Sequence, residues 1–178
     1  MRRLALLLIL VVAGCGSEAV EPLPDTRSAE PQAAVLNWRE SYPATGERLV
    51  FGVRSFELTN DGWSSEISIE NRTKISFDLG DGPPLAFGLV LLPDDDVKTL
   101  DQMTSRDGLL LREPKTIQPP PPSVLAAGET WRATIAAPGS LADSAYVRIS
   151  FGPLVAIGEP PKDMQASVVW ITDRSYRL

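Results

Sequence analysis

Apolar and polar residues alternate with a period of two in four separate segments of the chain. These segments span residues 63–70, 74–79, 130–135 and 146–151. In the first segment the polar face carries Glu66 and Glu70, and in the last it carries Tyr146, Arg148 and Ser150. Such alternation is typical of a β-strand with one face on a core and one face in water. We therefore predict that all four segments are strands of antiparallel sheets.

Three more segments are predicted to be strands with other patterns. Residues 85–92 and 168–171 are apolar on both faces, as expected for central strands. Segment 48–59 changes phase, because its apolar residues follow one register in the first half and the opposite register in the second. A β-bulge near Arg54 and Ser55 would reconcile the two halves.

Clusters of glycine, proline and aspartate separate these strands. Asn60-Asp61-Gly62 predicts a tight hairpin, since Asp-Gly suits positive φ. Residues 119–122 are all proline and predict a long loop, because proline cannot donate to a sheet ladder. Helical periodicity is limited to one turn around 97–103 and another around 141–145. The whole pattern predicts an all-β fold, an immunoglobulin-like antiparallel sandwich of about seven to nine strands.

Residues 15–36 precede the predicted strands and show no periodic pattern of apolar residues. The stretch holds three prolines, small residues and scattered charges, a composition typical of a disordered tether. A chain of roughly 20 such residues spans about 25 Å on average. We therefore predict three parts: a signal peptide at 1–14, a tether at 15–36 and one folded domain at 37–178.

The signal peptide begins with two arginines and continues with an apolar run at 4–12, as in a secretory signal. This run is shorter than the roughly 20 residues that a helix needs to cross a bilayer. Val12-Ala13-Gly14-Cys15 resembles the lipobox of bacterial lipoproteins, with valine in the place of the usual leucine. The resemblance implies cleavage before Cys15, a diacylglyceryl thioether on its thiol and usually an acyl chain on its amine. Two or three acyl chains anchor a protein stably to a membrane, so we expect a location in the bacterial cell envelope, outside the cytoplasm.

Composition narrows the function of the predicted mature chain, residues 15–178. Cleavage removes two of the 17 basic residues and leaves 15 against 23 acidic ones, a formal net charge of −8. This balance argues against nucleic acid as a partner. The chain contains no histidine, the commonest general base and metal ligand, and it lacks the Ser-x-x-Lys and P-loop motifs. We therefore predict that the protein is not an enzyme and uses no cofactor.

Three segments resemble parts of the immunoglobulin-like domains found on many bacterial lipoproteins. They are a strand end at 67–73, a turn into a strand at 125–131 and a closing strand at 169–173. In the turn, Ala127 stands where that family has proline. The intracellular proteinase inhibitor family is similar more distantly, through the same sandwich. The resemblance covers roughly 48–173 and implies a fold, while function does not follow from it.

Two acidic turns could supply oxygen ligands for calcium. Asp94-Asp95-Asp96 follows a predicted buried strand, and Asp78, Asp81 and Gly82 form the second turn. The first turn lacks the glycine and the glutamate of an EF-hand loop. We interpret both turns as solvated loop charges and keep calcium binding as an alternative function.

Two further residue sets could form sites on the sheets. Glu66 and Glu70 would project from one strand face about 13 Å apart, beyond the roughly 6.5–9.5 Å of an inverting carboxylate pair, so we interpret them as a polar face.

Aromatic side chains could form a platform for sugars. The candidates are Trp38, Tyr42, Trp63, Trp131 and Trp170. We interpret those in the predicted strands as core residues and keep carbohydrate binding as an alternative.

Two short motifs have structural interpretations. Prolines 119–122 satisfy Pro-x-x-Pro and would form a stiff polyproline II spacer. Asn71-Arg72-Thr73 matches a glycosylation acceptor, but after a bacterial lipoprotein signal we interpret it as a strand end.

Together these patterns predict a lipid-anchored envelope protein whose sandwich is a non-enzymatic interaction or structural module. Its expected contacts are a membrane, through Cys15, and another envelope protein or a glycan. A carbohydrate- or calcium-binding module and a proteinase-inhibitor-like protein are the alternatives.

Overall fold

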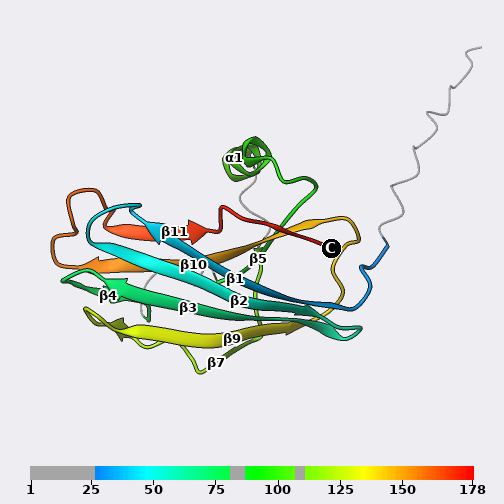
Figure 1. The fold of residues 1–178 in the computed structure, drawn as a ribbon, viewed down its shortest axis with the longest axis horizontal. Coiled ribbons are helices and arrows are strands. Elements are labelled where there is room, and N and C mark those ends of the chain that lie inside the picture. The colour runs from blue at the N-terminus through cyan, green and yellow to red at the C-terminus, as the bar shows by residue number, and fades with distance from the viewer. Residues whose placement is uncertain (1–26, 81–86, 107–110) are drawn as a thin grey trace, which may run out of the picture.

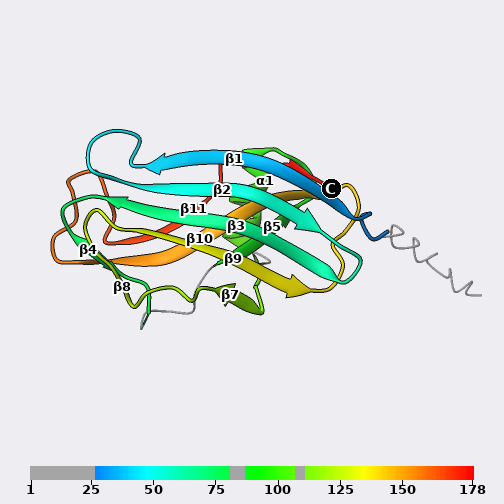
Figure 2. The ribbon, with the colours of Figure 1, turned by 60° about the horizontal axis from the view of Figure 1, so that its bottom comes forward.

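Two antiparallel sheets pack face to face in the computed structural model, which describes residues 27–80, 87–106 and 111–178 (Figure 1). The first sheet has the strand order β1 (Gln32–Tyr42), β2 (Arg48–Leu58), β3 (Gly62–Arg72), β9 (Thr130–Pro138) and β7 (Thr116–Gln118). Its first three strands are consecutive in the chain and pair over nearly their full lengths. Figure 2 shows this sheet from its outer side, with β1 at one edge and β7 at the other.

The second sheet is organised around its longest strand, β10 (Tyr146–Ile157). The other strands are β6 (Leu111–Arg112), β5 (Gly88–Leu92), β4 (Ser76–Asp78), β8 (Val124–Leu125), β11 (Ser167–Ile171) and β12 (Tyr176–Arg177). These two sheets confirm the predicted all-β sandwich. The described residues form twelve strands rather than seven to nine, because several strands have only two or three residues and show no readable alternation.

The core lies between the two sheets and is filled by the inward side chains of both. Phe51 on β2 lies 5.2 Å from Phe151 on β10, measured between ring centres. Phe87 meets Trp131 on β9 edge-on at 5.5 Å. All four side chains are buried, and large aromatic side chains dominate the hydrophobic stabilisation of such a core.

Two local predictions on β2 and β3 are confirmed. The pairing of these strands shifts register between Val53 and Ser55, at the predicted bulge. The predicted hairpin closes between them, with Thr59 N donating to Gly62 O at 2.8 Å. The glycine is required for close approach rather than for positive φ, since a Cβ on Gly62 would lie 2.4 Å from the carbonyl oxygen of Ala137.

Strand pairing begins before the predicted domain boundary at Asn37. β1 starts at Gln32, and two backbone hydrogen bonds of 2.7 and 2.8 Å already join residues 27–29 to 141–143. β1 is an edge strand with β2 as its neighbour, and alternate residues in its first half are exposed. Backbone pairing at a sheet edge needs no strong apolar stripe, so periodicity did not reveal this strand.

The predicted wet face of β10 is wrong. Arg148 and Ser150 are 2% and 3% exposed, and Tyr146 is half-buried. The loop at 93–96 and the turn at 172–175 lie against this side of the strand, as the hydrogen bonds of Arg148 show. Alternation predicts which residues share a face, but it does not predict which distant loop covers that face.

The two segments that are apolar on both faces occupy different places. β5 is a buried strand between β6 and β10, as predicted, although residues 85 and 86 of that segment lie outside the described part. β11 pairs with β10 alone among the described strands, and Val169 is 51% exposed. The second segment is therefore an edge strand and not a central one.

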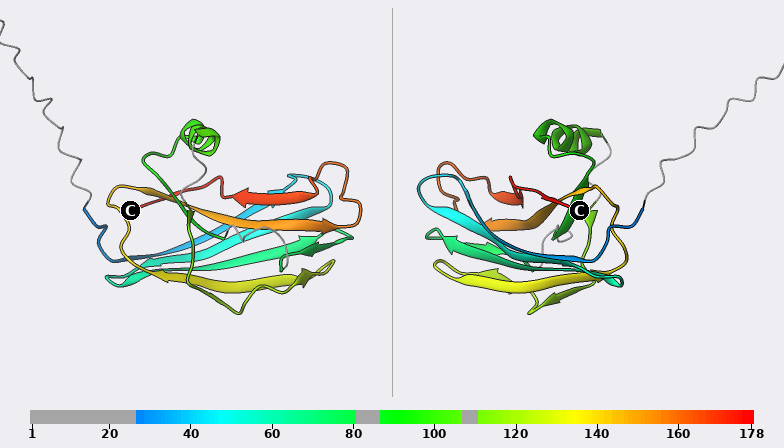
Figure 3. Two further views of the ribbon diagram at one scale, coloured as in Figure 1. Left: turned by 180° about the vertical axis from the view of Figure 1, so that it is seen from behind. Right: turned by 45° about the vertical axis from the view of Figure 1, so that its right-hand side comes forward.

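A single helix, α1 (Val97–Arg106), is present among the described residues and begins where a helical turn was expected. Figure 3 shows it beyond the outer side of the second sheet. The other expected helical turn, at 141–145, is a tight turn with an isolated bridge from Ser28 to Ala142. Within the described ranges, no helix combines the length and the apolar character needed to cross a membrane.

Candidate functional site

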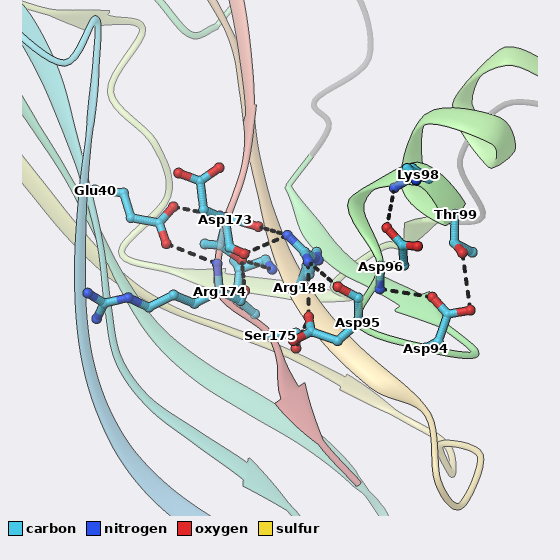
Figure 4. Close-up of polar contacts among 12 residues, drawn as sticks. Glu40, Asp94, Asp95, Asp96, Lys98, Thr99, Arg148, Asp173, Arg174 and Ser175 are labelled. Carbon is cyan, nitrogen blue, oxygen red and sulfur yellow. Dashed lines mark hydrogen bonds and ion pairs between the residues drawn. The ribbon is translucent and has the colours of Figure 1, made fainter.

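The three aspartates of the first acidic turn have separate partners (Figure 4). Asp94 accepts hydrogen bonds from Asp96 N at 2.9 Å and from the Thr99 hydroxyl at 3.1 Å. Asp96 accepts one from Lys98 N at 2.9 Å, in the position of an N-cap of α1. Two of the three carboxylates therefore stabilise the start of the helix.

Asp95 instead pairs with Arg148, the buried arginine of β10. Arg148 Nη2 lies 3.0 Å from Asp95 Oδ1, and the side chains are 2% and 58% exposed respectively. Arg148 also donates to the carbonyl oxygens of Thr172 at 2.9 Å and Asp173 at 2.7 Å, while the Ser175 hydroxyl donates to Asp95 at 2.5 Å. A buried charge is costly unless it is paired and hydrogen-bonded, and these partners meet most of that requirement.

Glu40 on β1 binds the same turn from the side of the first sheet. Its carboxylate accepts hydrogen bonds from Trp170 Nε1 at 3.0 Å, from Asp173 N at 2.8 Å and from Arg174 N at 3.2 Å. The turn after β11 is thus held from two sides, by Glu40 and by Arg148 (Figure 4). We interpret this network as a structural junction between the two sheets.

The acidic turns do not form a metal site from the residues that the structure describes. Within this part of the chain, no three His, Cys, Asp or Glu side chains come together in a group that could hold a metal ion. Asp78 of the second turn accepts a hydrogen bond from Gly80 N at 2.8 Å, and Asp81 and Gly82 lie outside the described residues. The calcium alternative therefore finds no support in the described side chains.

The aromatic candidates for a sugar platform are all engaged within the protein. Trp63 and Trp131 are buried in the core, which confirms their interpretation as core residues. Trp170 lies 5.8 Å from Tyr42, measured between ring centres. Trp38 is half-buried and packs against the core cluster. This packing leaves the carbohydrate alternative without the stacking surface on which it depended.

Asn71 marks a strand end, as predicted, and fixes the turn that follows it. Its side chain is fully buried and donates to the carbonyl oxygens of Ile75, Leu125 and Ala126 at 2.8, 3.2 and 3.0 Å. Its amide oxygen accepts from the backbone N and the hydroxyl of Thr73, at 3.0 and 2.7 Å. The Asn-x-Thr motif thus joins the end of β3 to the segment before β9.

The outer face of the first sheet, turned away from the core, concentrates positive charge. By the pairing register, its outward arginines are Arg39, Arg48, Arg54, Arg72 and Arg132, and its outward glutamates are Glu57, Glu66 and Glu70. This confirms the polar face predicted for β3. Five positive and three negative charges give this face +2, whereas the whole chain carries −6, so all other residues together carry −8.

Glu70 is shared by two of these arginines. Arg39 Nη2 donates to its carboxylate, and Arg72 Nε donates to it at 2.6 Å. Hydrogen bonding from Arg72 lowers the pKa of Glu70 below its ordinary value, burial works against this shift, and Arg39 lowers the pKa further. Along the same strand, Glu66 lies 3.4 Å from Arg54 Nε. Both glutamates therefore orient arginines on the outer face.

A shallow hollow of about 410 Å³ lies on the outer face beside Glu66. Its lining includes Arg54, Glu66, Ser68, Gln118, Pro119 and Arg132. Gly52 has no side chain that could rise above the sheet beside Ser68. A Cβ at this position would lie 2.4 Å from Ser68 Oγ. Arg132 is exposed and has no hydrogen-bond or ion-pair partner among the described residues. Pro119 opens the proline run, which lies between β7 and β8 as the predicted loop.

The grouping of these arginines cannot be read from the sequence. They are spread from residue 39 to residue 132, and only the pairing of β1, β2, β3 and β9 brings them to one face. The available signal was the alternation itself, which places Arg72 and Arg132 at outward positions of their strands.

Comparison with known proteins finds no match for this chain among protein families, curated proteins or solved structures.

Proposed function

We propose that the protein is a lipid-anchored component of the bacterial cell envelope and that its sandwich is a non-enzymatic interaction module. The observation that supports this most directly is the outer face of the first sheet. It gathers five arginines in an acidic chain and offers a shallow hollow lined by Arg54 and Arg132. The acidic turn at 94–96 and the aromatic candidates, by contrast, make their contacts within the fold.

Cys15 is the proposed anchor and lies outside the described residues. Eleven residues lie between it and Arg27, the first described residue, which makes twelve residue steps. A fully extended chain of that length reaches at most about 40 Å. Under this proposal the end of the sandwich near Arg27 and the turn at 141–143 is the end closer to the membrane.

The anchor has a direct test in the substitution Cys15→Ala. We expect the variant to lose labelling by radioactive palmitate and to accumulate as an unprocessed precursor, because the thiol that accepts the lipid is gone. Gel mobility and autoradiography of whole cells measure both effects. A variant that is still labelled would contradict the lipobox interpretation.

The interaction role is tested by crosslinking in intact cells. The full-length protein would carry a photo-crosslinking amino acid in place of Thr134 on the outer face, with a matched control position at Arg112 on β6. Mass spectrometry of the products should identify one predominant envelope protein. A search that recovers no partner from either position would contradict the interaction role.

A further inference from the structure

We infer that the outer face of the first sheet binds an extended, carboxylate-rich segment of a partner protein, an inference that rests on the proposed interaction role. The outward strand positions of this face carry five arginines and three glutamates, interspersed with small polar side chains. The glutamates of this face pair with only some of its arginines, so the partner segment should supply carboxylates for the others.

The arginines of this face form two groups, and each contains more arginines than glutamates. In the Glu70 group, Arg39 and Arg72 share one carboxylate, and Arg48 stands directly opposite Arg72 in the pairing of β2 with β3. Like charges directly opposite each other in a sheet are destabilising. A carboxylate from outside would relieve this repulsion.

The second group surrounds the hollow. Arg54 lies 3.4 Å from Glu66, and both side chains are well exposed, at 78% and 48%. Arg132 lines the same hollow and has no partner among the described residues. The hollow thus holds one carboxylate and two guanidinium groups, of which only Arg54 is paired with Glu66, and a second carboxylate could bind Arg132 without displacing Glu66.

The spacing of the two groups fits an extended peptide. Glu66 and Glu70 are four residues apart on β3, which corresponds to about 13 Å at the rise of a strand. An extended ligand rises by the same amount per residue, so acidic side chains four positions apart would meet both groups. Ser68 and Gly52 lie between the groups and are small enough to let a backbone pass.

Side-chain chemistry favours carboxylates as the ligand groups. All basic residues that the register places on this face are arginines. Guanidinium groups present paired donors in a planar fork, and that fork matches a carboxylate in a bidentate manner. Such contacts are directional, so they select the position of the acidic groups as well as their charge.

Two other ligand classes fit less well. An anionic membrane surface attracts a basic face by about 1 kcal/mol per basic residue, but Glu57, Glu66 and Glu70 are interspersed here and leave only +2. A glycan binds best where an aromatic ring can stack on it, and the outward strand positions of this face carry no Trp, Tyr or Phe. An acidic protein segment is therefore the favoured partner.

The test uses the full-length protein in detergent and a fluorescent peptide that alternates glutamate and threonine. We expect binding by fluorescence anisotropy that weakens as salt is raised. The double variant Arg54→Glu, Arg132→Glu should lose at least about tenfold in affinity, whereas Arg112→Glu on the other sheet should bind as the wild type does. A peptide with glutamine in place of glutamate is the matched ligand control.

Several outcomes would overturn the inference. They are no binding at about 1 mM peptide, equal binding of the glutamine peptide, and equal loss of affinity in Arg112→Glu. Stronger displacement by glycerol phosphate or by oligogalacturonate than by unlabelled peptide would indicate a lipid headgroup or an acidic glycan instead. If crosslinking in cells finds a partner through the Arg112 position and not through Thr134, the interaction role stands and the acidic-segment inference falls.

Discussion

Arg148 and Arg132 are the same side chain in opposite surroundings. Arg148, on β10 of the second sheet, is 2% exposed and is surrounded by carbonyl oxygens and one carboxylate. Arg132, on β9 of the first sheet, is exposed and has no partner among the described residues. The first guanidinium organises the fold, and the second is available for an external ligand.

The comparison shows that burial, rather than residue type, decides what an arginine contributes. A buried guanidinium must recruit partners to offset the loss of hydration, so it fixes the segments that supply them. Arg148 accordingly links residues 93–96 to residues 172–175, which are far apart in sequence. An exposed guanidinium without a partner stays hydrated, so it does not hold other segments of the chain in place and can bind an external ligand.

The largest predicted effect is that of Arg148→Met. The substitution leaves the carbonyl oxygens of Thr172 and Asp173 without their donor, and removing one partner of a buried charged network costs about 3 kcal/mol or more. Urea denaturation measures the change in the free energy of unfolding. The exposed control Arg112→Met should change it by less than about 0.5 kcal/mol. Equal effects of the two substitutions would contradict the distinction between buried and exposed arginines.

Asp95→Ala should have an intermediate effect, a loss of about 1–2 kcal/mol. Among the described residues, Asp95 supplies the only carboxylate bonded to Arg148, but the arginine keeps its carbonyl partners, and Asp95 is itself 58% exposed. Thermal or urea unfolding provides the measurement, with the exposed Asp163→Ala as the control. A loss as large as that of Arg148→Met would mean that the ion pair, and not the carbonyl oxygens, dominates the junction.

Glu70→Gln, on the outer face of the first sheet, should change the pH dependence of the free energy of unfolding. The arginines keep the pKa of Glu70 below its ordinary value of 4.5 in the folded chain. Its ionised form therefore stabilises the fold above that value, and the contribution is lost as the pH falls through 4.5 toward the folded-state pKa.

The wild type should accordingly lose more stability on acidification than Glu70→Gln, by less than about 1 kcal/mol because the pair is partly exposed. Urea titrations above and below pH 4.5 measure the difference. Added salt should reduce it by screening the pair. A difference with the opposite sign would contradict the pKa shift.

The sequence predicted those features of the fold and of the candidate site that depend on residues close together in the chain. The phase change around Arg54 and Ser55 predicted the bulge, because only an extra residue can keep both apolar registers on the core. The outward position of Arg132 also followed from alternation within one strand. Both features depend on residues adjacent in the chain.

The features that the sequence could not reveal depend on contacts between distant segments. Arg148 occupied a polar position in an alternating strand, and its burial follows from partners 24 to 53 residues away. The grouping of five arginines on one face likewise required the order β1, β2, β3, β9, which connects strands across more than 50 residues. Periodicity predicts which side chains of one strand share a face. The order of the strands in the sheet determines which side chains of other segments lie next to them.

The smallest predicted effect on stability is that of Arg132→Gln, a change of less than about 0.5 kcal/mol. The side chain is exposed and has no partner among the described residues, so its removal leaves no orphaned group in the fold. The same substitution should weaken binding of the acidic peptide, because the hollow then keeps Arg54 alone beside Glu66. Parallel measurement of unfolding and of peptide affinity separates the two roles. A stability loss above about 1 kcal/mol with unchanged affinity would make Arg132 a structural residue like Arg148, and the distinction between the two arginines would fail.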